Sequence, residues 1–164
     1  MTNPLNDLLT IERIKSMHPI LRDELTADYL EINQKLPKYV RLRFTHTYRS
    51  IQEQNDLYAK GRTIKGNKVT NAKGGSSFHN YGLAFDIAIL LDNDKNGTFE
   101  SISYAQDENF MKVVDFFKSK GYEWGGDFKS FKDKPHFQKT FGKSINDLKT
   151  KKTFTEDGKL YPVL

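Results

Sequence analysis

The sequence predicts a single domain of the α+β class. Residues 40–45 alternate apolar and polar side chains, which is the period of a half-buried strand. Residues 83–91 form a longer, strongly apolar run, which predicts a buried strand. In residues 107–120 the apolar side chains recur at helical spacing, so we expect one face of this helix to pack on the core. A chain of 164 residues, 37% of them hydrophobic, is long enough to bury such a core.

The first half of the chain predicts helices before and after a strand. We expect a lead-in, a helix, the first strand, a second helix and a long loop at residues 1–9, 10–36, 40–45, 50–60 and 61–76. Pro19 kinks the first helix or splits it in two, because proline lacks a backbone donor. Ser50 and Glu53 form a capping box that opens the second helix, and Gly61 ends it. We expect the long, glycine-rich loop to form one wall of a cleft.

The second half predicts strands around one helix. We expect the apolar strand, a returning strand, a helix, two short strands and a weak C-terminal helix at residues 83–91, 98–103, 107–120, 122–124, 136–138 and 144–150. Residues 92–97 form a turn, and residues 125–132 form a loop. Residues 142–164 are polar, and the weak helix is the one element that we expect in them.

The composition excludes several kinds of protein. The chain has no cysteine, so any transition-metal site must use histidine and carboxylate. Residues 1–10 lack a basic segment followed by an apolar core, so we expect no signal peptide. No apolar run is long enough to be a transmembrane segment. We expect the protein to be made in the cytoplasm and to act as a monomer.

The charge balance favours an anionic partner. The net charge is +5, and such a surface attracts nucleic acid, anionic membrane or an acidic cell-wall polymer. However, the lysines and arginines are scattered, so we expect no nucleic-acid partner. A basic binding module without catalysis stays as a distant alternative.

Two histidines and two aspartates are the best candidates for chemistry. Asp86 lies in an apolar strand, where a carboxylate is costly unless a cation or hydrogen bonds compensate it. His79 lies before it, and Gly82 between them lets the chain bend. A catalytic zinc site uses three protein ligands, typically imidazole and carboxylate, and leaves a fourth position for water. His79, Asp86 and His136 would supply that set, and Asp133 would be free to act as the base.

The spacing of the last two residues is a constraint on the fold. Asp133 and His136 are three residues apart, which would place them on opposite faces of a regular strand. We therefore expect the chain to bend at Lys134 and Pro135. The simpler alternative for the pair of His79 and Asp86 is a chance spacing, because a buried aspartate can also be a capping or turn residue.

Three motifs in order resemble one family of enzymes. They are Tyr48-Arg49-Ser50 with Gln54, Leu57, Tyr58, Gly61, Arg62 and Thr63; Ser77-x-His79-x-x-Gly82-x-Ala84-x-Asp86; and Glu123-Trp124-Gly125-Gly126-Asp127-Phe128 with Asp133-x-x-His136-Phe137. Together they resemble the zinc metallopeptidases that cut bacterial cell-wall peptides. That family includes D-Ala-D-Ala carboxypeptidases and dipeptidases and the L-alanyl-D-glutamate peptidases of phage endolysins and bacterial autolysins. The likeness covers a catalytic core of about residues 39–138.

The resemblance implies a peptidase that hydrolyses the L-Ala–D-Glu bond of peptidoglycan stem peptides, and so degrades the cell wall after release or export. It implies one Zn²⁺ ion held by His79, Asp86 and His136. Asp133 would be the general base, and Arg49 would stabilise the oxyanion. The alternative is a D-Ala-D-Ala carboxypeptidase or dipeptidase of the same family. Asp133 in place of glutamate and the segment around Arg49 favour the first activity.

The resemblance also implies the arrangement of the fold. We expect a small antiparallel sheet with packed helices and the zinc site in a cleft on the open face of the sheet. Residues 142–164 are too few for a separate cell-wall-binding domain. We therefore expect residues 1–164 to be one zinc peptidase domain.

Several further residues have weaker signals. Ser77 and Trp124 are candidates for substrate binding, but Ser77 can equally cap its loop, and Trp124 can be a cleft wall or a core residue. For His18 we expect a surface or packing role. For His46 we favour a structural role over one in lining the cleft.

A calcium loop is the remaining alternative for one turn. Asp92, Asp94 and Asn96, followed by Gly97, resemble the first half of a calcium-binding loop. The full pattern needs a glutamate at position twelve, where this chain has Ser103, although Glu100 stands at position nine. We favour an Asn-Gly hairpin turn, which needs no Ca²⁺.

Overall fold

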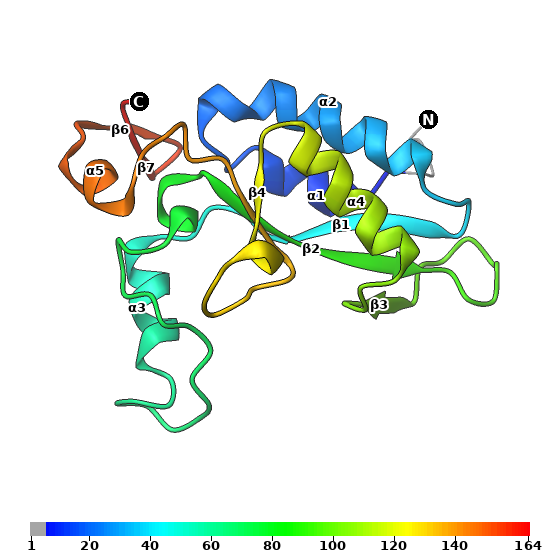
Figure 1. The fold of residues 1–164 in the computed structure, drawn as a ribbon, viewed down its shortest axis with the longest axis horizontal. Coiled ribbons are helices and arrows are strands. Elements are labelled where there is room, and N and C mark those ends of the chain that lie inside the picture. Colours follow the sequence, from blue (N-terminus) through cyan, green and yellow to red (C-terminus); the bar gives the residue numbers. More distant parts are fainter. Residues whose placement is uncertain (1–5) are drawn as a thin grey trace.

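The computed structural model describes residues 6–164; residues 1–5 of the predicted lead-in 1–9 lie outside the described part. Figure 1 shows the helices and strands of the chain. In order they are α1 (Leu8–Ile14), α2 (Pro19–Lys35), β1 (Val40–His46), α3 (Ile51–Ala59), the 3₁₀ helix η1 (Phe78–Tyr81), β2 (Ala84–Leu91), β3 (Ser101–Ser103), α4 (Glu108–Ser119), β4 (Glu123–Trp124), the 3₁₀ helix η2 (Gly125–Asp127), β5 (His136–Gln138), α5 (Ile145–Thr150), β6 (Thr153–Glu156) and β7 (Lys159–Pro162).

The main sheet is built around β2, the apolar strand. One edge of β2 pairs with β1 at residues 86–91, and the other edge pairs with β5 at residues 84–86 and with β3 at residues 89–91. β4 pairs with β5, so the order is β1-β2-β5-β4, with β3 beside β2. Every pairing is antiparallel, which confirms the predicted small antiparallel sheet.

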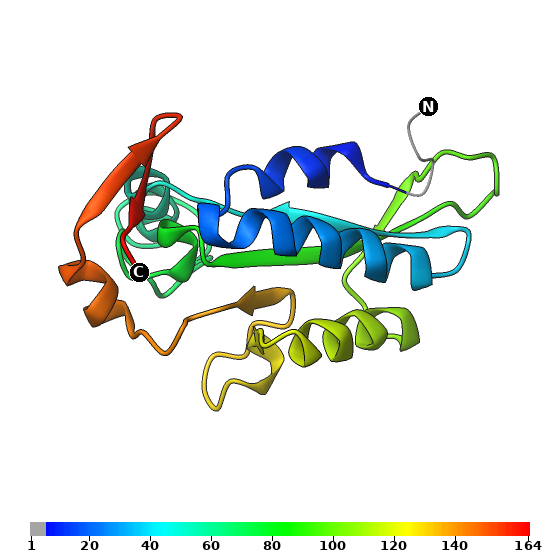
Figure 2. The ribbon, with the colours of Figure 1, turned by 90° about the horizontal axis from the view of Figure 1, so that it is seen from above.

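The core lies between this sheet and the helices α1, α2 and α4, which cover one of its faces (Figures 1 and 2). The predicted apolar stripe of α4 is buried there. The ring of Phe85 stacks on Phe44 at 4.2 Å and on Phe137 at 5.4 Å between ring centroids. Because successive side chains of a strand point to opposite faces, Asp86 points away from this aromatic core. Asp86 therefore lies on the face of the sheet that the helices do not cover.

The local signals of the first half are confirmed. Pro19 is the first residue of α2, where its missing backbone donor costs nothing, so the predicted helix is split in two. The Oγ atom of Ser50 accepts a hydrogen bond from the amide of Glu53 at 3.1 Å, and the Glu53 carboxylate accepts one from the amide of Ser50 at 2.7 Å. This capping box opens α3.

The C-terminal segment differs from the prediction. The weak helix is present as α5, but residues 153–162, where we expect no strand, also form the hairpin of β6 and β7. Asp157 and Gly158, both with positive φ, make the turn, and an Asp-Gly pair is a recognised hairpin signal. Tyr161 of this hairpin is fully buried, and its ring lies 5.6 Å from the ring of His18. The hairpin is therefore packed against the start of α2.

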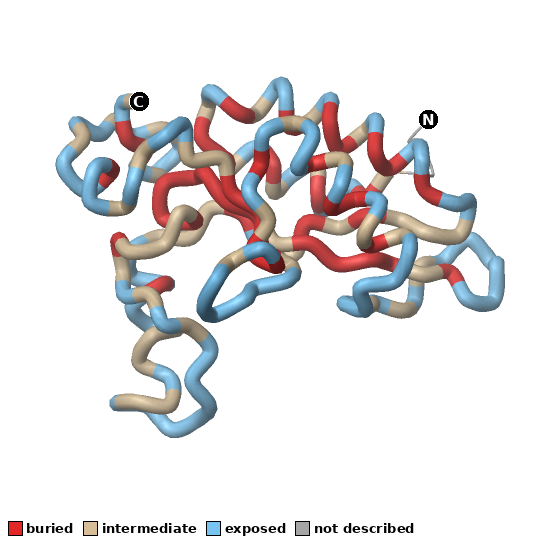
Figure 3. The backbone as a smooth tube through the Cα atoms, in the orientation of Figure 1, coloured by how far each residue is buried: buried red, intermediate tan, exposed pale blue. Residues whose placement is uncertain are grey.

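The buried residues lie where the sheet and the helices meet (Figure 3). The buried residues follow β2 and the inward sides of α2 and α4, whereas the loops at residues 61–74 and 127–134 are exposed or half-buried. In the part of the chain that the structure describes, no helix is long and apolar enough to cross a membrane.

Candidate metal centre

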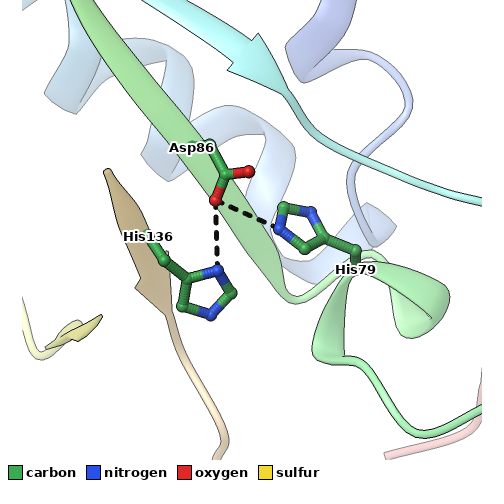
Figure 4. Close-up of side chains that lie close together, drawn as sticks. All are labelled: His79, Asp86 and His136. Atoms are coloured by element: carbon green, nitrogen blue, oxygen red, sulfur yellow. Dashed lines mark hydrogen bonds and ion pairs between the residues drawn. The ribbon is translucent and has the colours of Figure 1, made fainter. Parts of the chain in front are cut away.

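Three side chains from distant parts of the chain meet on the uncovered face of the sheet (Figure 4). The Oδ1 atom of Asp86 lies 3.2 Å from Nε2 of His79 and 3.1 Å from Nδ1 of His136. One ligand atom from each residue lies within 4.8 Å of the others. These are the three residues that the sequence predicts as metal ligands.

Strand pairing positions two of them. Asp86 lies opposite His136 in the pairing of β2 with β5, and opposite His46 in the pairing of β2 with β1. The pairing of β1 is irregular between Phe44 and His46. Asp86, His46 and His136 therefore form one row across three strands, with Asp86 in the middle.

The 3₁₀ helix η1 positions His79. The Oγ atom of Ser77 caps this helix by accepting a hydrogen bond from the amide of His79, and Asn80 accepts one from the amide of Ser77, both at 3.3 Å. Gly82 ends the helix with φ of 69°, and a Cβ atom there would lie 2.6 Å from the backbone nitrogen of His18. Only glycine fits this close approach, and it turns the chain directly into β2.

Each imidazole is also held from its far side. Nδ1 of His79 lies 2.7 Å from the backbone carbonyl oxygen of Thr47, which can only accept, so this nitrogen carries the hydrogen. Nε2 of His136 lies 2.8 Å from Oε1 of Gln138. Two oriented imidazoles and one carboxylate are a donor set that fits Zn²⁺, because zinc-bound histidines usually donate their second N–H to a fixed oxygen.

The close contacts in the centre shift the pKa values of Asp86 and His136. Burial alone would raise the pKa of Asp86, but His79 and His136 outweigh it and hold that pKa far below its usual range. Burial alone would lower the pKa of His136, but the hydrogen bond to Asp86 outweighs it and raises that pKa. The carboxylate of Asp86 is therefore ionised although it is largely buried.

The centre opens into a cavity of about 460 Å³. Val69, Thr70 and Ala72 line it from the long loop, which confirms that this loop forms one wall. Phe131, from the loop before β5, lines it from another side and is largely exposed. An exposed aromatic side chain at the rim gives the cavity an apolar edge.

Asp133 lines the same cavity beside the centre. Its Oδ2 atom lies 4.0 Å from Nδ1 of His136. The predicted bend is present, because the amide of His136 donates to the carbonyl of Asp133 and the carbonyl of Pro135 accepts from Ile87. Burial raises the pKa of Asp133, and the charge of Asp86 raises it further.

Arg49 lines the cavity as well, and Gln54 holds it. Nη1 of Arg49 donates to Oε1 of Gln54 at 2.9 Å. Gln54 is fully buried, and its amide donates to Thr70 and to the carbonyl of Ala72 in the cavity wall. The sequence places Gln54 in a motif but gives it no role, because its burial, on a helix whose other residues are exposed or half-buried, depends on the loop that covers it.

The comparisons with known proteins agree with this site. The family model described as D-alanyl-D-alanine carboxypeptidase, of the M15 peptidases, matches residues 70–139. The peptidoglycan L-alanyl-D-glutamate endopeptidase CwlK of Bacillus subtilis (strain 168) is 42% identical over 126 residues, which are 74% of this chain and 72% of that relative. This chain belongs to the M15 peptidase family.

The fold of this M15 peptidase is similar to that of a solved relative. The crystal structure of the L-Ala D-Glu endopeptidase ChiX of Serratia marcescens matches with a TM-score of 0.51 at 20% sequence identity, over 81% of this chain and 87% of that chain. M15 peptidases are in general zinc-dependent. The segment that the family model matches contains His79, Asp86, Asp133 and His136, whereas Arg49 precedes it.

The two candidate substrate-binding residues of this M15 peptidase differ in position. Ser77 lines the cavity, whereas Trp124 is not among the described residues that line it. Nε1 of Trp124 donates to the carbonyl of Lys134 at 2.7 Å, and the indole covers Gly126 so closely that no Cβ fits there. Trp124 thus holds the loop that carries Asp133.

The other two histidines also differ. His18 is buried, with Nε2 2.7 Å from the carbonyl of Pro162 and Nδ1 accepting from the amide of Ile20. This is the packing role that we expect for it. His46 lines the cavity, with Nδ1 3.7 Å from Oδ2 of Asp86. The structure therefore places His46 in the cleft, which is the alternative to the structural role that we favour from the sequence.

The turn at residues 92–97 brings carboxylates together. Oxygen atoms of Asp92, Asp94 and Glu100 lie within 4.8 Å of one another. The Asp92 carboxylate accepts hydrogen bonds from the amides of Asn96 and Gly97. A calcium titration of the melting temperature, repeated with Asp94→Ala, separates a calcium loop from a plain turn.

Proposed function

We propose that this M15 peptidase hydrolyses the L-alanyl–D-glutamate bond in the stem peptides of peptidoglycan. The observation that carries the proposal is the convergence of His79, Asp86 and His136 on a cavity that Asp133 and Arg49 also line. The relative that is 42% identical is named for this activity, which supports the choice of bond.

We propose one Zn²⁺ ion as the cofactor, held by His79 Nε2, Asp86 and His136 Nδ1. When bound, zinc polarises the scissile carbonyl and lowers the pKa of a water molecule. The two imidazoles direct these nitrogens toward the centre because their other nitrogens already face oxygen partners. The residues hold the ion at the cavity, where a peptide can reach it.

Asp133 is the general base in this proposal. Its carboxylate lies beside the ligands, 4.0 Å from His136 Nδ1, and faces the cavity. A base works best when its pKa lies near the working pH, and burial moves the pKa of Asp133 in that direction. Asp133 takes the proton of the attacking water and passes it to the amine of the departing D-glutamate.

Arg49 binds the oxygen of the scissile carbonyl and stabilises the negative charge that develops on it. The bond from Nη1 to Gln54 fixes one side of the guanidinium and leaves its other donors for the substrate. A cation that is positioned before the reaction needs little rearrangement as the charge forms, so Gln54 contributes through Arg49.

A D-Ala-D-Ala carboxypeptidase or dipeptidase is the second candidate, because the matching family model is described by the carboxypeptidase activity. Digestion of purified peptidoglycan distinguishes the two. We expect new amino termini on D-glutamate; released D-alanine without them would replace our proposal with the second candidate. Activity that chelation abolishes and zinc restores would show dependence on the metal.

A non-catalytic binding module predicts a different result. In that case Asp133→Ala would release as little peptide as the wild type, and binding to the wall would be the measurable property. We further propose that the protein is made in the cytoplasm, reaches the wall by release or export, and works there as a monomer. Sedimentation of the purified chain tests the last point.

A further inference from the structure

Two side chains outside the candidate centre form a chain of hydrogen bonds to His136. Gln138 lies two residues after His136 on β5, so both side chains are on the same face. Glu123 lies opposite Gln138 in the pairing of β4 with β5. Oε1 of Gln138 is 2.8 Å from Nε2 of His136, and Nε2 of Gln138 donates to Oε2 of Glu123 at 3.0 Å.

The direction of this chain of bonds follows from what each group can do. A carboxylate can only accept, so Glu123 requires the NH₂ group of the Gln138 amide. The amide oxygen then faces His136, and because that oxygen can only accept, Nε2 of His136 must carry the hydrogen. With its hydrogen fixed on Nε2, His136 has Nδ1 as the nitrogen that can give up its hydrogen in favour of a metal ion; Nδ1 lies 3.1 Å from its hydrogen-bond partner Asp86.

We propose that Glu123 and Gln138 are positioning residues that fix the metal-binding tautomer of His136. This inference rests on the proposed metal function of His136. A reversed amide would offer NH₂ to Nε2, so the hydrogen would move to Nδ1 and block the ligand position. Gln138 is 8% exposed, so its amide depends on these two partners more than on water.

The other imidazole shows why two residues are needed here. His79 donates to the backbone carbonyl of Thr47, and a carbonyl oxygen can only accept a hydrogen bond. His136 faces a side-chain amide, which can be turned by half a rotation to exchange its oxygen and nitrogen. Glu123 removes that ambiguity although it is exposed itself.

The affinity for zinc, measured by competition with a coloured chelator, tests the proposal. Gln138→Leu should weaken binding by about 10–100-fold, as is typical when a partner of a metal ligand is lost. Glu123→Gln should weaken it less. The exchange Glu123→Gln with Gln138→Glu should restore it to within a few-fold of wild type, because the new carboxylate still accepts from His136 and the new amide donates to that carboxylate. Gln106→Leu, at an exposed glutamine outside this chain of bonds, is the matched control.

Wild-type affinity in Gln138→Leu would overturn the proposal, and so would an exchange variant that folds but binds no better than Gln138→Leu. Long-range ¹H–¹⁵N spectra of the wild-type protein need no variant: we expect the hydrogen on Nε2 of His136 and zinc on Nδ1, and the opposite arrangement would also overturn it. A wild type that binds no zinc would instead refute the proposed function. In that case, an Nε2 of His136 that carries no hydrogen in the purified protein would still overturn the role of Glu123 and Gln138.

Discussion

Asp86 lies directly opposite His136 in the antiparallel pairing of β2 with β5, and their side chains meet at 3.1 Å on the face away from the aromatic core. Opposed residues of such a pair have side chains about 5 Å apart at Cβ. The spacing of two proposed ligands is therefore set by the sheet itself. Only His79 depends on a turn, and the close approach of Gly82 to His18 fixes that turn.

Replacing Asp86 by asparagine should remove most metal binding. The substitution keeps the shape but deletes the charge that draws a cation between the two imidazoles. We expect the affinity for zinc to fall by more than the roughly 10–100-fold that loss of a ligand's partner causes. Metal analysis after dialysis checks this, with Asp115→Asn on the exposed side of α4 as the control. Full zinc content in Asp86→Asn would contradict the ligand set.

Replacing Asp133 by asparagine should separate binding from catalysis. Asp133 lies beside the ligands and is not part of the closest set, so zinc content should stay at the wild-type level. The turnover number should fall by about 10²–10⁴-fold, the usual contribution of a general base. Asp127→Asn, an exposed carboxylate in the same region that pairs with Lys118, should keep its rate.

Replacing Arg49 by lysine should lower kcat by about 10²–10³-fold, because a lysine keeps the charge but cannot bond Gln54 and the substrate oxygen in the same geometry. Gln54→Leu should act in the same direction by a smaller factor. Gln52→Leu is its matched control, since Gln52 lies on the same helix and its amide donates to the exposed Asp56. If Gln54→Leu and Gln52→Leu have equal rates, Gln54 has no part in positioning Arg49.

Protonation of His18 should weaken the fold in mild acid. Burial lowers the pKa of His18, and Arg22 lowers it further, although the bond to Pro162 opposes them. Because the unfolded chain binds the proton more readily, the stabilisation is complete above the unfolded pKa of about 6.5 and is lost as the pH falls through the lower folded value. A proton on Nδ1 would also oppose the amide of Ile20 that now donates to it.

Urea unfolding at several pH values between 7.5 and 5 measures this loss. His18→Gln should have a smaller change in the free energy of unfolding over that interval than the wild type. Equal changes in the two proteins would assign the pH dependence to other groups.

Zinc should raise the melting temperature, since an ion that binds only the folded chain stabilises it. At a free concentration of 100 times Kd the gain is about 2.7 kcal/mol. Differential scanning calorimetry with and without a chelator checks this, and Asp86→Asn should have no such shift. A shift of equal size in that variant would indicate binding elsewhere.

Local features of this fold could be predicted because each depends on neighbours in sequence. Pro19 splits a helix, and Ser50 with Glu53 opens another, through contacts within a few residues. The His79, Asp86 and His136 set could be proposed because a carboxylate in an apolar strand needs compensation and the motifs resemble a known family.

The contacts that complete the site have no such local signal. Thr47 contributes a backbone carbonyl, which every residue has, and Gln54 is a neutral amide whose partners come from other segments. Gln138 is close to His136 on the same strand, but the orientation of its amide depends on Glu123 of β4. The C-terminal hairpin had a signal in Asp157 and Gly158, but its strands are short and mostly polar. Its burial depends on His18, more than a hundred residues earlier.

The pairing of β5 with β2 covers only three residues on each strand, so few backbone bonds define its register. A slip by one residue would turn His136 into the aromatic core and Phe137 out to solvent. An ion can bind His79, Asp86 and His136 together only when β5 has the correct register against β2. Metal binding would thus favour the correct register of β5 against β2. A chain with the wrong register would lose both the metal site and the catalytic activity.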